Sequence, residues 1–496
     1  MHIVILGGGA CGMMAAWELC ARGARVTILE RERRPGGLCG TIEDGGYHFD
    51  LGGHRVISQN RELVTRLEAL LGDEFLRRVR SSVILNGGEQ FHYPLQAAEL
   101  LRKVPLREAA AVWTSYAQAA IARRLRPAAD SSFEDWVVRR FGRVLYDRFF
   151  GPYTEKLWGI SPTEISSDWA AQRISLLDLT DVLLRLGGLR KGGARTYAKR
   201  YLYPRRGIGQ LFTRMAEEIT ALGGNILYGT AVTGLVTEPA FPGSAARRIR
   251  AVRFRSSDPS EPKSGDPAES EKSEELAADA VISTLALPAL IAMLGSRPMM
   301  LAEPALRAAE RLRFRGVRFL NIKLDRPRFS PHTWMYVSEP RYLATRIQEP
   351  AHRSPYAAPP GKTSIMLEIP CQVGGRVWTM PDDALYERCL ADLADLGFAD
   401  VRRDTLGYFC SYVEEGYPVY HRSYLDDRRT ALDSLARFTN LTSCGRQGSF
   451  RYVFMDTAME MGLLAAERTL QGRSATAEVA GLRSERGLIE TRSVIG

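Results

Sequence analysis

Residues 2–12 read "HIVILGGGACG" and join a short apolar run to a cluster of glycines. The apolar residues 2–6 are typical of a buried strand, and "MMAAWELCARG" (13–23) has helical spacing followed by a glycine stop. A second apolar run, "RVTILE" (25–30), indicates another strand. Together these elements predict a β-α-β unit at the start of the sequence.

The glycines of this unit have the spacing that a dinucleotide requires. Gly7, Gly9 and Gly12 form GxGxxG directly between the strand and the helix. We expect Gly7 to make the tight turn, Gly9 to let the backbone approach a pyrophosphate, and Gly12 to pack helix against strand. Glu30 ends the second strand 18 residues after Gly12 and is placed to accept hydrogen bonds from ribose. A Rossmann-type site is therefore predicted; the alternative is a glycine-rich turn in an unrelated α/β fold.

The length and composition of the chain narrow the class of protein. With 496 residues, 45% hydrophobic and 25% charged, it is expected to form two or three globular domains. Its net charge of +10 is compatible with an acidic partner: nucleic acid, anionic lipid or a phosphorylated small molecule. The arginines are scattered and form no nucleic-acid module, so we expect an anionic small molecule and no nucleic acid. No apolar run reaches the about 18 residues of a membrane helix, which predicts no transmembrane segment.

The seven cysteines show neither a CxxC pair nor metal-ligand spacing. This usage predicts reduced thiols in a cytoplasmic protein and no metal site. Cys11, inside the glycine loop, is interpreted as a small spacer.

Further along the chain, helical patterns dominate from 59 to 190 and are interrupted by "RSSVILNGGEQFHYPLQ" (80–96), which predicts a hairpin with a Gly-Gly turn. Strand-like alternation at 225–255 precedes a Ser/Pro/Glu-rich stretch, 256–276, which we interpret as a disordered insertion. More strands follow, then a helix at 455–470 and a polar tail. An amphipathic helix around 105–125 suits core packing, a membrane surface or a partner subunit, so a homodimer stays open.

The segment after Glu30 indicates which dinucleotide the site binds, FAD or NAD. "RERRPGGLCGT" (31–41) resembles the second glycine pair of the FAD-binding superfamily of amine oxidases, protoporphyrinogen oxidases, phytoene desaturases and UDP-galactopyranose mutases, with Arg34, Gly36 and Gly37 as the matching residues. "VISTLALPAL" (281–290) resembles a later strand of that cofactor domain. The resemblance implies FAD as cofactor and an α/β fold: a Rossmann-type, glutathione-reductase-like FAD-binding domain with a mixed helical and antiparallel-sheet substrate domain.

On this reading, the FAD-binding domain comprises residues 1–75, 201–290 and 425–470. The helical and substrate domain comprises 76–200 and 291–424, and 471–496 form a flexible tail.

Six stretches resemble UDP-galactopyranose mutases, the eukaryotic type most closely: 50–58, 80–96, 152–174, 203–212, 334–356 and 445–462. Tyr336 stands ten residues before Arg346, and Ser354-Pro355 begins eight residues after it, as in that family. The resemblance implies that Arg173 and Arg346 bind a substrate diphosphate from opposite sides. It places Gly53 and His54 beside the flavin and gives further residues two roles: substrate binding by Tyr93, Tyr336, Tyr417 and Tyr452, and cofactor binding by Arg446, Met455 and Asp456.

Two functions remain open at this point. In the mutase interpretation, paired guanidinium groups hold the diphosphate of a UDP-sugar during ring isomerisation through N5 of reduced flavin, and no side chain need act as acid or base. In the oxidoreductase interpretation (oxidase or dehydrogenase), a hydride passes to oxidised flavin. Amine oxidases place a lysine near N5, and Lys323 is the candidate, although a solvent-facing strand position is the simpler interpretation. A non-catalytic flavin-binding protein is a third class.

The sequence also departs from the mutase pattern. Arg353 occupies a family tyrosine position and Ala198 a family asparagine position, so contacts to the sugar are unassigned. Arg353 either strengthens a phosphate grip or faces water, and we interpret His352 as solvated.

Overall fold

The apolar residues 2–6 form β1 (His2–Leu6), the central strand of a five-stranded parallel sheet. The sheet order is β19-β13-β1-β2-β9, with β2 (Arg25–Leu29), β9 (Asn225–Leu227), β13 (Ala280–Ser283) and β19 (Leu441–Ser443). Because β1 is flanked by strands and covered by helices, its residues 3–6 are fully buried and its sequence is continuously apolar. The predicted β-α-β unit is confirmed.

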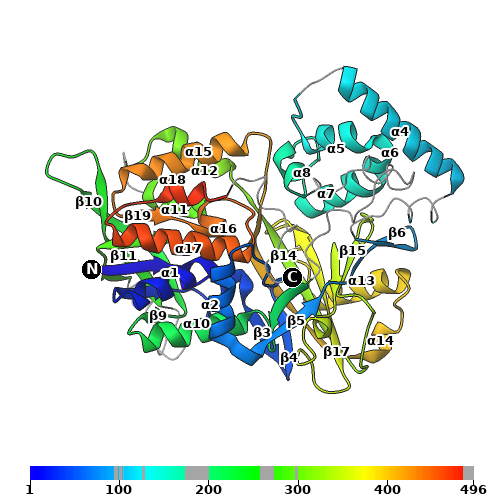
Figure 1. Cartoon of the computed structure of the whole chain (residues 1–496), viewed down its shortest axis with the longest axis horizontal. Coiled ribbons are helices and arrows are strands. Elements are labelled where there is room, and N and C mark those ends of the chain that lie inside the picture. Colours follow the sequence, from blue (N-terminus) through cyan, green and yellow to red (C-terminus); the bar gives the residue numbers. More distant parts are fainter. Residues whose placement is uncertain are drawn as a thin grey trace.

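Helix α1 (Ala10–Ala21) lies between two other helices of this lobe, α10 (Gly209–Ala221) and α17 (Met455–Leu470). Figure 1 shows α1 and α17 side by side, although they are far apart in the sequence. Gly462 permits this approach, since a Cβ there would lie 2.3 Å from the carbonyl oxygen of Cys11. The lobe built on the five-stranded sheet is thus assembled from widely separated segments.

A seven-stranded mixed sheet forms the second lobe, in the order β18-β14-β17-β16-β15-β6-β7. Neighbouring strands are antiparallel except β15 and β6, which are parallel. The strands are β6 (Ser82–Asn86), β7 (Glu89–His92), β14 (Phe314–Leu324), β15 (Trp334–Val337), β16 (Arg346–Gln348), β17 (Thr363–Cys371) and β18 (Thr405–Pro418). The predicted hairpin is β6–β7, whose turn residues Gly87 and Gly88 have positive φ angles of 62° and 78°.

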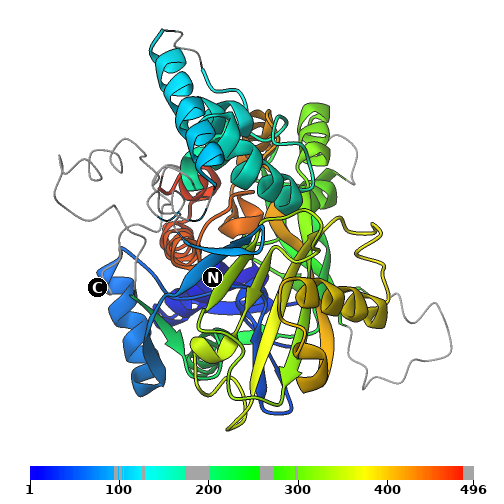
Figure 2. The same ribbon diagram turned by 90° about the vertical axis from the view of Figure 1, so that its right-hand side faces the viewer.

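A group of helices stands at one end of this sheet and projects from the body of the protein (Figure 2). It contains α4 (Leu106–Leu125), α5 (Phe133–Phe141), α6 (Arg143–Leu145), the π-helical turn η3 (Tyr146–Phe150), α7 (Gly151–Trp158) and α8 (Ser167–Arg173). Helix α4 covers the predicted amphipathic segment, and only its Ala109 and Val112 are buried.

The remaining strands form three small sheets: β3 (Thr41–Asp44) with β4 (Tyr47–Asp50), β5 (Phe75–Val79) with β8 (Arg200–Pro204), and β10 (Thr230–Pro239), β11 (Arg247–Ser256) and β12 (Glu274–Ala277). The remaining helices are α2 (Arg61–Leu71), α11 (Leu287–Gly295), α12 (Glu303–Arg311), α13 (Asp382–Asp395), α14 (Val401–Asp404), α15 (Tyr424–Ser434), α16 (Gly445–Gly448) and α18 (Thr476–Ala480). Short 3₁₀ turns are η1 (Gly37–Cys39), η2 (Gly72–Glu74), η5 (Pro350–His352) and η6 (Leu435–Arg437).

Two local expectations were wrong. Residues 75–79 lie in the region expected to be helical but form β5, because they pair with β8, a partner about 120 residues further along the chain. The expected flexible tail is packed up to residue 483: Thr476, Val479 and Ala480 of α18 are buried, and Thr476 Oγ1 accepts a hydrogen bond from the amide of Ser443. The domain boundaries as a whole stay a prediction.

The computed structural model describes residues 1–93, 99, 103, 105–125, 129–173, 200–256, 273–295 and 300–483, and of residues 172 and 173 only the backbone. Most of the predicted insertion at 256–276 lies outside these residues. Within them, no helix is both long and apolar enough to cross a bilayer.

Candidate active site

A cavity of about 770 Å³ lies between the parallel sheet and the seven-stranded sheet. All of the predicted site residues line it except Gly12 and Arg173. Gly12 lies behind the loop: a Cβ at this position would be 2.1 Å from the carbonyl oxygen of Gly7, which agrees with a packing role. Arg173 is the last residue of α8, and its side chain lies outside the described part, so the second arginine of the diphosphate site stays a prediction.

The glycine loops form a backbone cradle at one end of the cavity. Gly7 has a φ of 97°, and a Cβ there would lie 2.4 Å from Thr284 Oγ1. Gly9 has no atom within 4 Å of an added Cβ, so the backbone is open to the cavity at this point. The two glycine loops are joined, since the amide of Gly36 donates to the carbonyl of Gly8 at 2.8 Å. This cradle fits the pyrophosphate of a dinucleotide.

Glu30 is buried beside this cradle, where its two carboxylate oxygens accept hydrogen bonds from the amides of Gly8 (2.6 Å) and Glu32 (2.8 Å). Burial raises the pKa of Glu30, while these two amides lower it. Each oxygen keeps a further lone pair for a ribose hydroxyl. Arg34 also lines the cavity, and its buried Nε has no partner among the described residues. Both residues therefore suit the cofactor role predicted for them.

His54 stands where the cofactor cradle meets the second lobe. Burial, and after it the charges of the nearby Arg446, Arg353 and Arg346, together lower its pKa to about 3. The imidazole is therefore neutral at physiological pH. Its buried Nδ1 has no hydrogen-bond partner among the described residues, so it is available to a ligand in the cavity.

Arg346, Glu368 and Tyr417 form a buried triad in the other half of the cavity. Nη2 of Arg346 donates to Glu368 Oε1 and to the Tyr417 hydroxyl, and that hydroxyl donates to the same carboxylate oxygen. Burial opposes the charge of Arg346, but Glu368 raises its pKa well above the ordinary value. The Nε of Arg346 is buried without a partner among the described residues. The arginine is therefore held in place on one side and available to a ligand on the other.

Glu368 is a residue that the sequence reasoning missed. It lies in β17, all nine residues of which are buried, and its side chain is 1% exposed. The signal was a single carboxylate in the apolar run "TSIMLEIPC" (363–371), because a charge in a buried strand needs a partner.

Two pairs of aromatic rings form walls around the triad. Tyr452 stacks on Tyr417 with ring centroids 5.6 Å apart, and the Arg446 guanidinium lies 4.0 Å from the Tyr452 ring. In the second pair, the ring centroids of Tyr93 and Tyr336 are 4.6 Å apart, and Arg80 Nη2 donates to the Tyr336 hydroxyl at 3.3 Å. All four predicted substrate tyrosines thus meet in one half of the cavity.

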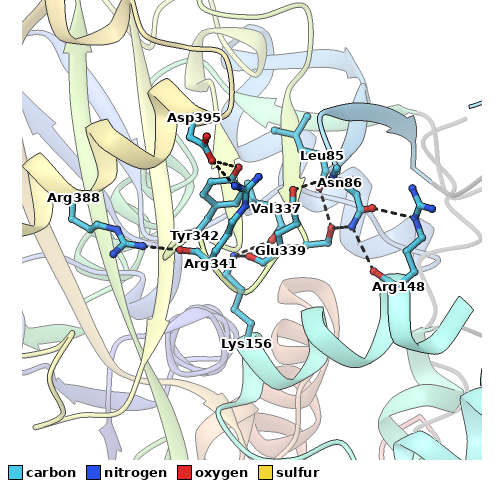
Figure 3. A network of polar contacts seen from close by, with 12 residues as sticks. Leu85, Asn86, Arg148, Lys156, Val337, Glu339, Arg341, Tyr342, Arg388 and Asp395 are labelled. Carbon is cyan, nitrogen blue, oxygen red and sulfur yellow. Dashed lines mark hydrogen bonds and ion pairs between the residues drawn. The ribbon is translucent and has the colours of Figure 1, made fainter. Parts of the chain in front are cut away.

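Figure 3 shows how the strands that carry Tyr336 and Arg346 are fixed at their shared turn. Lys156 of α7 is largely buried and donates hydrogen bonds of 3.1, 3.0 and 2.6 Å to three backbone carbonyls, those of Val337, Glu339 and Ala344. On the other side of the turn, the Tyr342 hydroxyl donates to Asp395 of α13 at 2.7 Å. The helical group and the sheet lobe therefore both hold the turn from which the two site residues extend.

The basic residues near Arg346 do not behave as expected. Arg353 neither binds in the cavity nor faces water: it is 1% exposed, and its Nη1 lies 3.0 Å from Asp50 Oδ2. His352 is not solvated, since its Nε2 lies 2.6 Å from the carbonyl oxygen of Ser330 and it is 12% exposed. Both side chains turn inward because buried acceptors are close to them.

Lys323 lies away from the cavity and forms a 2.6 Å ion pair with Asp44. Cys11 is a free buried thiol whose Sγ lies 3.3 Å from that of Cys444. Ala198 lies outside the described residues.

Comparison with known proteins identifies the family of this architecture. The family model described as "Flavin containing amine oxidoreductase" matches residues 10–470. Among curated proteins, a phytoene dehydrogenase of Streptomyces griseus is 47% identical over 51 residues, 10% of each chain. A coproporphyrinogen III oxidase of Propionibacterium freudenreichii subsp. freudenreichii is 28% identical over 180 residues, 34% of this chain and 33% of its own. The chain thus matches well under two thirds of the length of these relatives.

Solved structures resemble the protein over almost its whole length. A reduced UDP-galactopyranose mutase superposes with a TM-score of 0.79 at 20% identity, covering 98% of both chains. A putrescine oxidase variant gives a TM-score of 0.63 at 15% identity, covering 95% of this chain and 98% of its own. At these identities the likeness shows the fold, an α/β flavoprotein architecture with a mixed second sheet.

Proposed function

The chain belongs to the flavin-containing amine oxidoreductase family and is an FAD-dependent enzyme, and we propose that its substrate is a nucleotide-diphosphate sugar. The reaction that we propose is a ring isomerisation of the UDP-galactopyranose mutase type. The proposal extends to the substrate roles of Arg173, Arg346 and the four tyrosines.

One observation carries this proposal: the lining of the cavity combines arginines with tyrosine hydroxyls. Arg346, Arg80 and Arg446 line it, together with Tyr336 and Tyr417. A diphosphate carries about two negative charges, which guanidinium forks neutralise with paired hydrogen bonds. Neutral phenols add donors without further charge. Such a lining suits a diphosphate better than it suits an apolar polyene or a cationic amine.

The side chains contribute binding and electrostatics to this reaction. Bound reduced FAD supplies a nucleophilic nitrogen for the anomeric carbon of the sugar. The arginines stabilise the charge that gathers on the diphosphate as its bond to the sugar breaks. Glu368 is engaged by Arg346 and Tyr417 and keeps both oriented, so it acts through them rather than as a base. Neutral His54 offers a hydrogen bond beside the cofactor without adding a charge.

A second candidate is an oxidoreductase, favoured by the match to a coproporphyrinogen III oxidase over 180 residues. Within the oxidoreductases, the amine-oxidase type is disfavoured, because the cavity-lining residues of the described part include no lysine and Lys323 is paired with Asp44.

The test is UDP binding by the holoenzyme, measured by isothermal titration calorimetry. Charged hydrogen bonds contribute about 1.5–3 kcal/mol each, so Arg346→Ala should weaken UDP binding about ten- to a hundredfold. The matched control is Arg341→Ala, since Arg341 lies in the same hairpin but is 59% exposed and outside the cavity. Unchanged UDP affinity in Arg346→Ala would show that the assignment is wrong.

Turnover then separates the two candidate reactions. UDP-galactopyranose is incubated with the enzyme in the presence and absence of dithionite, and the products are separated by chromatography. Isomerisation only with reduced flavin, without net redox change, supports the mutase. Peroxide release or dye reduction that does not depend on a nucleotide supports the oxidoreductase instead.

A further inference from the structure

We propose that Arg483, in the segment that follows α18, is a cofactor-site residue. Its guanidinium neutralises two carboxylates at the start of α17 and thereby makes that end of the cavity suitable for the diphosphate of FAD. This proposal depends on the cofactor and not on the identity of the substrate.

The first observation is where the side chain of Arg483 lies. It lines the same cavity as the glycine cradle and the first residues of α17. Its Nη2 lies 2.6 Å from Glu460 Oε1, and its Nη1 lies 3.4 Å from Asp456 Oδ2. Asp456 and Glu460 are four residues apart on one helix and so face the same way. Arg483 is 25% exposed, which leaves it both paired and in contact with the cavity.

The second observation is a strained backbone. Arg483 has a φ of 56°, in the left-handed region that is strained for a residue with a Cβ. The strain persists because Arg451, itself 1% exposed, donates hydrogen bonds of 2.9, 2.9 and 2.7 Å to three carbonyls at and after the end of α18, those of Ala480, Leu482 and Arg483. Such over-determined strain is characteristic of functional positions.

The third observation concerns the charges that surround the cradle. The N-terminal residues of α1 and α17, Ala10, Cys11 and 455–458, line the same cavity, and helix N-termini attract phosphates. Asp456 and Glu460 oppose that attraction. Burial raises the pKa of Asp456 to about 6, and Arg483 acts in the opposite direction. Among the described residues, the donor to the Glu460 carboxylate besides Arg483 is the side-chain amide of Asn60, which is neutral. Arg483 therefore supplies the positive charge that removes the repulsion.

The experiment follows FAD release from the diluted holoenzyme by the rise in flavin fluorescence, with circular dichroism as a separate measure of folding. Arg483→Ala should release FAD at least tenfold faster, and Arg483→Lys, which keeps the charge without the fork, should be intermediate. Arg473→Ala is the matched control, because Arg473, in the turn between α17 and α18, is an exposed arginine outside the cavity. It should change the rate less than twofold.

A double variant tests the electrostatic part of the argument. In Arg483→Ala/Glu460→Gln one repelling carboxylate is gone, so FAD release should slow relative to Arg483→Ala alone. Wild-type release from Arg483→Ala, or no recovery in the double variant, would overturn the proposal. If Arg483→Ala does not fold, Arg483→Gln decides, because it also removes the charge, and wild-type release from that folded variant would overturn the proposal. None of these outcomes depends on UDP binding, so failure of the proposed function is seen separately.

Discussion

The buried pair of Arg353 and Asp50 provides a demanding test of the structure. Asp50 Oδ2 accepts from Arg353 Nη1 (3.0 Å) and from the Tyr203 hydroxyl, while Oδ1 accepts from Thr41 Oγ1 (2.7 Å) and the amide of Ile208 (3.0 Å). The pair joins the sheet lobe to β4, the strand that leads into the Gly52-Gly53 loop at the cavity. Replacing Arg353 by methionine keeps much of the volume but removes the charge.

The expected loss of stability follows from the burial of both side chains, each of which is 1% exposed. Removing one member of a buried ion pair leaves the other charge uncompensated and costs about 3–5 kcal/mol. At the unfolding midpoint, an entropy of about 2.1 cal/mol/K per residue gives roughly 1 kcal/mol/K for this chain. Arg353→Met should therefore lower Tm by about 3–5 °C. Asp50→Asn should have an effect of the same sign.

The assay is thermal unfolding of the holoenzyme, followed by circular dichroism for both single variants and the double variant. Removing both charges leaves no uncompensated ion, so the double variant should be more stable than the sum of the single effects predicts, by about 0.5–3 kcal/mol. Strict additivity, or a Tm for Arg353→Met within 1 °C of the wild type, would refute the argument.

Three other predictions concern packing, protonation and the triad. Gly462→Ala should lower Tm and release flavin, because its Cβ would meet the facing helix, whereas Gly407→Ala, with open space around it, should do neither; equal effects in calorimetry would contradict this. Burial lowers the pKa of Lys156 from 10.5 to about 7, so between these values the unfolded chain binds the extra proton and stability should rise with pH. Lys156→Met should lose this part of the Tm-versus-pH slope, and identical slopes would disprove it. Glu368→Gln leaves the Arg346 charge uncompensated, so titration should show tighter UDP binding together with a Tm lowered by a few degrees; weaker binding would contradict the arrangement.

Features of the fold could be predicted from the sequence where the interacting residues are close together along the chain. The glycine loop, its strands and the β6–β7 hairpin were correctly predicted because their causes are local: spacing, periodicity and turn chemistry. Arg353 was misjudged because its partner Asp50 lies 303 positions away. β5 was missed for the same reason, since no pattern within residues 75–79 indicates that they pair with β8.

In the candidate site, too, some residues could be identified from the sequence and others could not. Resemblance to a family located Arg346 and the four tyrosines, which the fold brings into one cavity. It did not locate Glu368, because its partner Arg346 lies on a neighbouring strand. It did not locate Arg483 either, because the position of Arg483 depends on hydrogen bonds that Arg451 donates to backbone carbonyls. These residues become visible only when charges are matched in three dimensions.

The order of strands in the parallel sheet has a consequence for how the protein is made. β1 is synthesised first, but its neighbour β13 begins at residue 280 and the edge strand β19 at residue 441. Because these contacts join distant parts of the chain, folding is expected to be slow. The first strands must leave the ribosome before they have their partners, and an unpaired apolar strand is prone to aggregate. The lobe that carries the glycine cradle is thus among the last to be completed, and we expect the yield of folded protein to depend on chaperones that protect its first strands during synthesis.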